Sequence, residues 1–151
     1  MEALGVEYQI LECDPDLADT RVFVQHYEFA IEDCANTIVV KSKTGERKYA
    51  ACVVLANCRL DVNRTVRKKL KARRVSFAGA EETEKFTGMS VGGVTPIGLP
   101  KTLPLWVDSA VMERENVVVG GGSRSWKIVV SPKIFTLTPN SEIVPGLAYP
   151  A

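Results

Sequence analysis

The sequence predicts a single α+β domain, residues 1–151, with a mixed or barrel-like sheet. Short apolar runs rich in β-branched residues recur along the chain, and stretches of helical spacing lie between them. A length of 151 residues with 46% hydrophobic residues suits one domain with a real core. No glycine-rich phosphate-binding motif follows a strand into a helix, which excludes the doubly wound nucleotide-binding folds.

The first elements are a strand, a helix and a hairpin. Polar and apolar residues alternate over 6–13, which predicts an early strand. The apolar spacing of residues 21–33 fits both a strand and a helix, and we favour the helix. Two β-branched runs, 34–42 and 48–57, flank a short polar turn that contains Gly45. These runs predict a β-hairpin.

Two short helices with a strand between them follow the hairpin. Asp61 is placed to cap a helix over 61–72, where apolar residues recur with a spacing of four. Residues 74–78 predict a short strand. Residues 79–88 predict a helix, because an acidic first turn begins the segment and a glycine ends it.

The second half of the chain is richer in strands. Strands are predicted at residues 102–111, 115–122 and 125–132. The last two pair most simply as a hairpin. Ser131 is placed to cap a short helix over 131–139, with proline at its first position. The tail, residues 144–151, is expected to be loosely attached.

Charge, cysteine usage and hydropathy argue against a metalloprotein, a membrane protein and a secreted protein. The net charge is +1, so the chain as a whole does not attract polyanions. The four cysteines form no CxxC pair and His26 is the single histidine, so no metal or other cofactor is expected. No apolar run is long enough to span a membrane, and the N-terminus lacks a signal-peptide pattern. We therefore expect a cytoplasmic protein with free, mostly buried thiols and no membrane partner.

One local run of charge stands apart from this balance. Residues 64–74, RTVRKKLKARR, carry seven basic residues and no acidic one. Such a run is typical of the solvated face of a helix, and it also suits contact with nucleic-acid phosphates. Both interpretations remain open at this point.

Two glycine clusters are the other unusual feature. The first lies in TGMSVGGVTPIGLP, residues 87–100, and the second is Gly120-Gly121-Gly122 followed by Ser123. Each cluster suits either a tight turn between strands or a pocket wall of exposed backbone amides. The presence of two clusters in one small domain favours a shared pocket.

Generic catalytic motifs are sparse. His26 falls within the predicted helix at 21–33 and no GxSxG motif accompanies it, so a Ser–His–Asp triad is not supported. Asp108 ends the apolar run LPLWVD. A carboxylate there is suited to bind backbone amides or a substrate amine, and equally to cap a turn.

The order and spacing of these motifs resemble a known family. TGxxxGGVTPxG is followed by LPxxxD and VxGGG, as in the YbaK/ProX family, the aminoacyl-tRNA editing domain also inserted in some prolyl-tRNA synthetases. The resemblance implies a mixed, largely antiparallel barrel-like sheet with flanking helices. It also implies hydrolysis, in trans, of the ester between a wrong amino acid and the 3′-terminal adenosine of tRNA. Family members between them handle alanyl, cysteinyl, seryl and threonyl esters.

The candidate site residues form three groups. The resemblance and the chemistry of exposed amides give the catalytic group Asn36, Gly92, Gly93 and Asp108. The substrate-binding group is Thr20, Val94, Pro96, Gly98, Gly120, Gly121, Gly122 and Ser123. The basic run contributes a tRNA-binding group of Arg67, Lys68 and Lys71. The expected partner is the 3′ aminoacyl end of tRNA, with an aminoacyl-tRNA synthetase as a second candidate.

Asn36 departs from the pattern of the family, whose members commonly carry a lysine just before the strand that matches TIVV. Asparagine donates and accepts hydrogen bonds but brings no charge. Three interpretations follow. Asn36 serves a different set of substrates, a nearby lysine such as Lys41 or Lys43 replaces the missing charge, or the chain is a catalytically silent module that binds tRNA ends or a synthetase.

Overall fold

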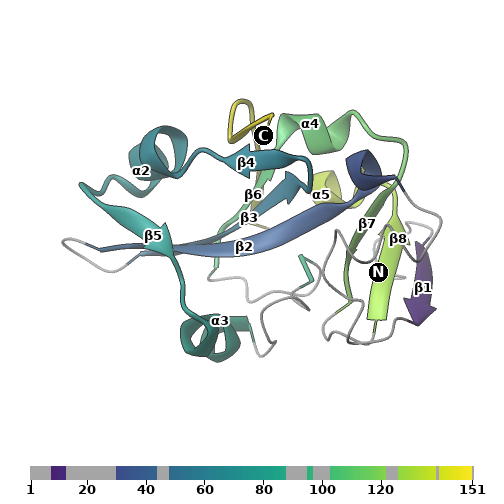
Figure 1. The fold of residues 1–151 in the computed structure, drawn as a ribbon, viewed down its shortest axis with the longest axis horizontal. Helices are drawn as coiled ribbons and strands as arrows, with labels where there is room; N and C mark the ends of the chain where they lie inside the picture. The colour runs from purple at the N-terminus through teal and green to yellow at the C-terminus, as the bar shows by residue number, and fades with distance from the viewer. Residues whose placement is uncertain are drawn as a thin grey trace.

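The computed structural model describes residues 8–12, 30–43, 48–87, 95–96, 103–121, 126–138 and 140–150. Its strands form sheets of five, three and two strands, with short helices around them (Figure 1). The α+β class with mixed, largely antiparallel sheets is confirmed. The described strands do not close into a barrel.

The five-stranded sheet is the centre of the fold. Its strands lie in the order β5 (Val75–Phe77), β2 (Ala35–Ser42), β3 (Tyr49–Leu55), β6 (Leu105–Asp108) and β9 (Ser141–Val144). The predicted hairpin is confirmed, because β2 and β3 pair antiparallel. The pairs β3–β6 and β6–β9 are parallel, so the sheet is mixed. Strand β3 is buried on both faces, which explains its unbroken apolar sequence.

The three-stranded sheet lies beside the start of β2 (Figure 1). Strand β8 (Trp126–Val130) pairs antiparallel with both β1 (Tyr8–Glu12) and β7 (Val117–Gly120). The hairpin predicted from residues 115–132 is therefore confirmed. A parallel bridge between Cys34 and Val118 connects this sheet to the N-terminal end of β2.

The C-terminal tail is part of the fold, so the prediction of a loose attachment was wrong. Strand β10 (Ala148–Pro150) pairs antiparallel with β4 (Cys58–Leu60). Leu147 is fully buried, and Gly146 makes the turn before it with a φ of +73°, which a glycine adopts without strain. The tail is short, but its partners lie in a distant part of the sequence, where a local pattern gives no sign of them.

Six short helical segments surround the sheets in the described part of the chain. They are η3 (Ile31–Asp33), η4 (Val62–Val66), α2 (Arg67–Leu70), α3 (Ala80–Thr87), α4 (Ser109–Met112) and α5 (Ile134–Leu137). The helices predicted at 61–72, 79–88 and 131–139 are present. Helix α4 was not predicted, because the sequence suggested a strand through residue 111. Of the helix predicted at 21–33, only residues 30–33 are described.

Neither of the two predicted helix caps is present. The Asp61 side chain makes no capping bond to the backbone of η4, so that prediction was wrong. Its carboxylate instead accepts a hydrogen bond from the Thr65 hydroxyl at 3.3 Å. Ser131 Oγ accepts a hydrogen bond from the Lys133 amide at 3.3 Å, just before α5 begins at Ile134. The N-cap of α5 is Lys133, so the prediction of Ser131 as the cap and of proline at the first helical position was wrong, and the Ser131 hydroxyl instead stabilises the turn before the helix.

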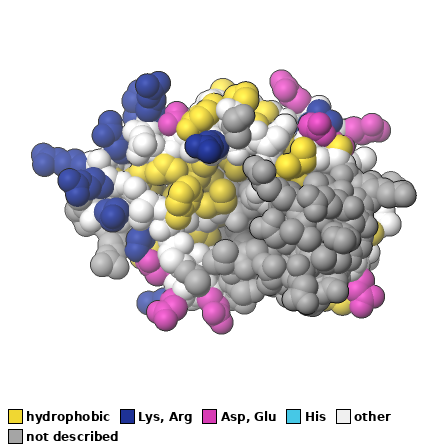
Figure 2. All heavy atoms as spheres, viewed as in Figure 1, with side chains coloured by type: hydrophobic (Ala, Val, Ile, Leu, Met, Phe, Trp, Pro, Cys, Tyr) yellow, Lys and Arg dark blue, Asp and Glu magenta, His cyan; other side chains and the backbone are white. Residues whose placement is uncertain are grey.

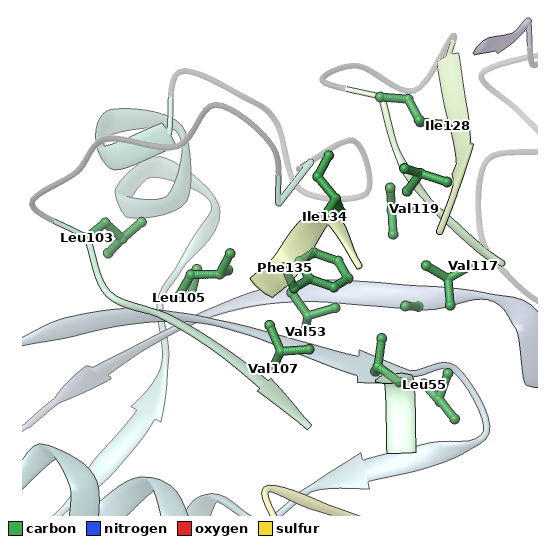
Figure 3. Close-up of a cluster of buried hydrophobic side chains, with 14 residues drawn as sticks. Val53, Leu55, Leu103, Leu105, Val107, Val117, Val119, Ile128, Ile134 and Phe135 are labelled. Carbon is green, nitrogen blue, oxygen red and sulfur yellow. The ribbon is translucent and has the colours of Figure 1, made fainter. Parts of the chain in front are cut away.

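Two apolar clusters cover the two faces of the five-stranded sheet, because side chains alternate along β3. The first cluster contains Val53 and Leu55 and packs against Phe135 of α5 and against β7 and β8 (Figure 3). The second cluster contains Cys52 and Val54 and packs against α2, β4 and the tail. These faces are called the first-cluster face and the second-cluster face below.

Leu147→Ala tests the role of the tail. We expect the free energy of unfolding to fall by about 2–5 kcal/mol, because the substitution leaves a cavity in a fully buried position. Tyr149→Ala, at a residue 49% exposed in the same tail, should change it by less than about 1 kcal/mol. Denaturant unfolding measures both, and equal effects would contradict a docked tail.

Candidate functional site

The start of β2 brings distant predicted site residues level with one another. Cys34 is bridged to Val118 in a parallel register, and this register, continued by two residues beyond the isolated bridge, aligns Asn36 with Gly120. Gly120 is paired with Lys127 on β8. Asn36, Gly120 and Lys127 therefore form a row across β2, β7 and β8, which is called the Asn36 row below.

The row extends to β6 on its other side. Asn36 is paired with Val54 of β3, and the parallel register of Val53 with Val107 makes Val54 level with Asp108. Within the five-stranded sheet, strand register thus aligns Asn36 with Asp108, and the register continued from the Cys34–Val118 bridge adds Gly120 to this line.

The members of the Asn36 row share one face of the sheets. Ala35, Val119 and Ile128 all belong to the first cluster. Because side chains alternate along a strand, the residues next to them, Asn36, Gly120 and Lys127, face the other way. Asn36 is exposed, whereas Lys127 is only 7% exposed.

Cys34 lies on the same face, two residues before Asn36. Burial raises the pKa of its thiol to about 11, while the charge of Lys127 lowers this pKa and the charges of Asp33 and Glu32 raise it. The thiol is therefore protonated at neutral pH and is not a nucleophile.

Gly121 is required by the hairpin itself. Its amide donates a hydrogen bond to the Trp126 carbonyl at 3.1 Å, and a Cβ on Gly121 would lie 2.6 Å from Trp126 Cβ. Only a glycine fits this close approach of the two strands. This geometry favours the turn interpretation for Gly121, since its amide is engaged within the hairpin.

Asp108 is 2% exposed and holds the tail against β6. Its Oδ1 accepts a hydrogen bond from the Ala148 amide at 3.3 Å. Burial raises the pKa of the Asp108 carboxyl, whereas the backbone amides of Ala148, Ala110 and Leu147 lower it. Of the roles predicted for Asp108, the structure shows the binding of backbone amides.

The remaining predicted site residues are described only in part. Pro96 is buried, next to Thr95, which is 8% exposed. The other residues predicted for substrate binding or catalysis lie outside the described residues: Thr20, Gly92, Gly93, Val94, Gly98, Gly122 and Ser123.

Thr37 is a polar residue of this region that the sequence did not single out. Its Oγ1 is buried and has no hydrogen-bond partner within the part of the chain that the structure describes. It lies next to Asn36 but faces the first cluster, because alternation turns it away from the row. The sequence feature that could have pointed to Thr37 is a polar side chain at the start of the otherwise apolar run TIVV.

The basic run lies on the surface of α2 and its flanks (Figure 2). Six of its side chains are exposed and are called the basic face: Arg64, Arg67, Lys68, Lys71, Arg73 and Arg74. Lys69 differs from them. Its Nζ lies 2.6 Å from Glu142 Oε2 and 5.1 Å from the centre of the Trp106 ring, so it joins α2 to the sheet. The tRNA-binding residues predicted from the sequence all belong to the basic face.

The basic face and the Asn36 row lie on the same side of the five-stranded sheet. Leu70 of α2 packs in the second cluster, on the face that also carries Asn36. The two features lie near opposite ends of β2. Asn36 is at its start, whereas Arg73 and Arg74 of the basic face lead directly into β5, which pairs with the last residues of β2, Val40–Ser42. Asn36 and Ser42 are six residues apart along β2, which corresponds to a distance of about 20 Å along the strand.

Helix α3 lies on the opposite side of β2 from α2 and is anchored by one carboxylate (Figure 1). Glu82 forms an ion pair with Lys41 and accepts a hydrogen bond from the Tyr49 hydroxyl at 3.0 Å. The hydrogen bond from Lys41, followed by those from Tyr49 and the Gly79 amide, lowers the pKa of Glu82 against the effect of burial. Helix α3 ends at Thr87, where the first glycine motif begins.

The described residues hold neither a metal-binding cluster nor a membrane-spanning helix. No three histidine, cysteine, aspartate or glutamate side chains gather there in a way that would hold a metal ion. In the same residues, no helix is long and apolar enough to cross a membrane.

Comparison with known proteins gives the class of this domain. The aminoacyl-tRNA editing domain matches residues 14–136. The chain therefore belongs to the aminoacyl-tRNA editing domain family, and the YbaK-type resemblance is confirmed.

Three similar proteins illustrate the match. A "Proline--tRNA ligase" of Caldicellulosiruptor saccharolyticus is 30% identical over 107 residues, 65% of this chain and 18% of the ligase. "Putative Cys-tRNA(Pro)/Cys-tRNA(Cys) deacylase EbsC" of Enterococcus faecalis is 28% identical over 102 residues, 67% of this chain and 60% of that protein. A crystal structure of "a putative trans-editing enzyme for prolyl tRNA synthetase" superposes with a TM-score of 0.79 at 18% identity, over 95% of this chain and 87% of that one. This chain spans less than two thirds of either curated relative.

Glu82→Gln tests the anchor of α3 through its pH dependence. The fold lowers the pKa of Glu82 from its ordinary value of 4.5. The ionised carboxylate therefore stabilises the fold above pH 4.5, and this stabilisation is lost as the pH falls through the lowered pKa. We expect the variant to melt at a lower temperature than the wild type at pH 7, with a smaller difference near about pH 3. Glu81→Gln, exposed on the same helix, is the control. An equal difference at both pH values would contradict the anchor.

Proposed function

We propose that this chain is an aminoacyl-tRNA deacylase that acts in trans on mischarged tRNA. The observation that carries the proposal is the geometry of the Asn36 row. Its support is the register that, continued from the Cys34–Val118 bridge, aligns Asn36 with Gly120 of the second glycine cluster, on the face of the sheet against which α2 packs. Membership of the editing-domain family supports the reaction class.

Asn36 is suited to bind the ester carbonyl of the substrate. Hydrolysis of the ester needs water at the carbonyl carbon and donors for the negative charge that develops on the carbonyl oxygen. The Asn36 side chain is exposed and carries two N–H donors. Gly120, which the continued register aligns with Asn36, carries no side chain, as a position facing an aminoacyl group requires.

The basic face is suited to bind the tRNA backbone. A stacked nucleic-acid strand carries one phosphate per ~3.4 Å, so about 20 Å from the row corresponds to roughly six nucleotides. The phosphates near the end of the acceptor stem would then lie over α2 while the terminal adenosine lies at Asn36. In this arrangement Arg67, Lys68 and Lys71 contact phosphates and contribute affinity without base specificity.

We assign Asp108 a structural role in this function. Its carboxylate is buried and is occupied by backbone amides of the tail. A general base needs access to the attacking water, which this arrangement does not offer. Asp108 instead holds the tail beside the row.

A second function, a catalytically silent binding module, is favoured by one observation. Asn36 is neutral at the position where the family commonly has a lysine. Lys41 does not replace that charge, because it lies on the other face of β2 and is paired with Glu82. The two functions make different predictions for the same substrates.

The first test is a deacylation panel of tRNAs that carry alanyl, cysteinyl, seryl or threonyl esters. We expect the wild type to hydrolyse at least one ester, and Asn36→Ala to lower kcat by about 10²-fold, as the loss of an oxyanion donor does. Asn57→Ala, at an exposed asparagine in the turn after β3, is the matched control and should keep wild-type turnover.

The panel separates the two functions. If the wild type hydrolyses no ester while a known editor does so in the same assay, the deacylase proposal is wrong. Stable tRNA binding together with turnover by Asn36→Lys would then identify the silent module.

Combined substitution of Arg67, Lys68 and Lys71 with glutamate tests the basic face. We expect weaker tRNA binding at low salt, and a plot of log affinity against log salt that is shallower by about two to three units, since three phosphate contacts are lost. Lys133→Glu, exposed before α5, is the control. An unchanged salt slope would show that the basic face only solubilises the domain.

A further inference from the structure

We propose that Tyr149 and Arg59 form a stacking platform for the unpaired 3′ nucleotides of tRNA that precede the aminoacylated adenosine. The platform is the solvent face of the two-stranded sheet of β4 and β10, which is called the β4–β10 ribbon below. The inference rests on the proposed function and adds a binding site between the basic face and Asn36.

The register of the ribbon brings the two side chains together. Tyr149 lies directly opposite Arg59, and the neighbouring pair, Ala148 and Leu60, packs into the second cluster. Because side chains alternate along a strand, Tyr149 and Arg59 project from the other face of the ribbon. Both are exposed, Tyr149 to 49%. The Cβ atoms of directly opposed residues lie about 5 Å apart, so one ligand can contact both the ring and the guanidinium.

The ribbon is anchored to the rest of the fold beside the platform. The Leu147 carbonyl accepts a hydrogen bond from the Asp61 amide at 2.8 Å, and the Thr65 hydroxyl donates one to the Gly146 carbonyl at 3.0 Å. Leu147 itself is fully buried. Tyr149 therefore presents its ring from a fixed backbone, which lowers the entropy lost when a ligand binds.

The ribbon lies between the basic helix and the start of β2 (Figure 1). On one side, η4, which carries Arg64, begins two residues after β4 ends. On the other side, the Ala56 amide donates a hydrogen bond to the Cys34 carbonyl at 2.8 Å, just before Asn36. Arg59 follows Ala56 by three residues, which span at most about 11 Å. The platform is thus close to the start of β2 and continuous with the basic face.

The charge of this surface suits a nucleic acid. Arg59 extends the positive charge of the basic face along the chain towards the start of β2. Two acidic residues of the region are engaged by neighbours: Asp61 accepts a hydrogen bond from Thr65, and Glu142 forms an ion pair with Lys69. A positive surface attracts the phosphates of the strand, while an exposed aromatic ring attracts its bases.

The unpaired 3′ end of tRNA is the part of the molecule that fits the platform. Bases of single-stranded RNA stack on aromatic rings and on guanidinium planes, whereas the bases of a paired stem are already stacked on one another. A stacked strand advances ~3.4 Å per nucleotide, so about 11 Å corresponds to roughly three nucleotides. The nucleotides before the terminal adenosine would then lie over Tyr149 while the aminoacyl end lies at Asn36.

Tyr149→Ala tests the platform. The probes are a fluorescent RNA hairpin of the acceptor stem whose unpaired 3′ end is ACCA, and the same hairpin with a blunt end. We expect the Kd of the first hairpin to rise about tenfold, because a base–aromatic stack is lost, and the Kd of the blunt hairpin to stay within about twofold. Fluorescence anisotropy measures both.

Two variants serve as matched controls. Tyr149→Phe keeps the ring and should bind both hairpins within about twofold of the wild type. Leu137→Ala removes an equally exposed apolar side chain, 49% exposed on α5, and should bind both hairpins as the wild type does. Arg59→Ala should weaken binding of the ACCA hairpin about threefold or more, because it removes the second stacking group.

Three results would overturn the platform. The first is a Tyr149→Ala variant that binds the ACCA hairpin as tightly as the wild type does. The second is an equal loss for both hairpins, which would show that the ring does not contact the unpaired bases. The third is a wild type with no preference for the ACCA hairpin over the blunt one.

A spectroscopic measurement detects the stack directly. Fluorotyrosine replaces the four tyrosines of the chain, and Tyr149→Phe assigns the ¹⁹F resonance of position 149. We expect this resonance to move upfield when the ACCA hairpin is added, because a stacked base shields the ring, and to stay in place with the blunt hairpin. An unmoved resonance at saturating ACCA hairpin would contradict stacking on Tyr149.

The platform and the proposed function can fail separately. In the deacylation assay we expect Tyr149→Ala to raise KM while kcat stays within about threefold, because the ring contributes to binding and not to the reacting atoms. If the wild type hydrolyses no ester but binds the ACCA hairpin through Tyr149, the deacylase proposal is wrong and the platform stands. If the wild type hydrolyses an ester and Tyr149→Ala binds the ACCA hairpin equally well, the platform is wrong and the function stands.

Discussion

The parallel bridge between Cys34 and Val118 is the interaction on which the rest of the site depends. It joins the three-stranded sheet to the start of β2, and so it decides which residues of β7 and β8 lie level with Asn36. A shift of this register by one residue would turn every side chain of one partner to the other face. The large apolar cluster between β3, β7 and α5 holds the register, because its members come from both sheets (Figure 3).

Strand alternation then separates the two faces by function. The first-cluster face carries the main core, and through Lys41 and Tyr49 it anchors α3. The second-cluster face carries Asn36 at one end of β2 and the basic helix near the other. A single strand therefore fixes both the separation and the common orientation of the candidate catalytic residues and the basic face. This arrangement lets one extended ligand contact both.

The elements that the sequence predicted well are those with local causes. The hairpin of β2 and β3 follows from two β-branched runs around a polar turn, and α3 follows from its acidic first turn. The failures have non-local causes. The tail docks through Leu147 and β4, and α4 begins where Asp108 turns towards that tail. No local pattern shows a partner that lies far away along the chain.

The sequence by itself determined the family, through the spacing of its glycine and proline motifs, and it located Asn36, Asp108 and the basic run. Only the tertiary structure decided that Asp108 serves the tail, that Gly121 is required by the hairpin and that Lys69 belongs to the sheet. It also decided that Tyr149 lies opposite Arg59. The physical reason is that strand pairing is non-local: a residue's neighbours across a sheet depend on register between distant segments, whereas motifs and helical spacing are written along the chain.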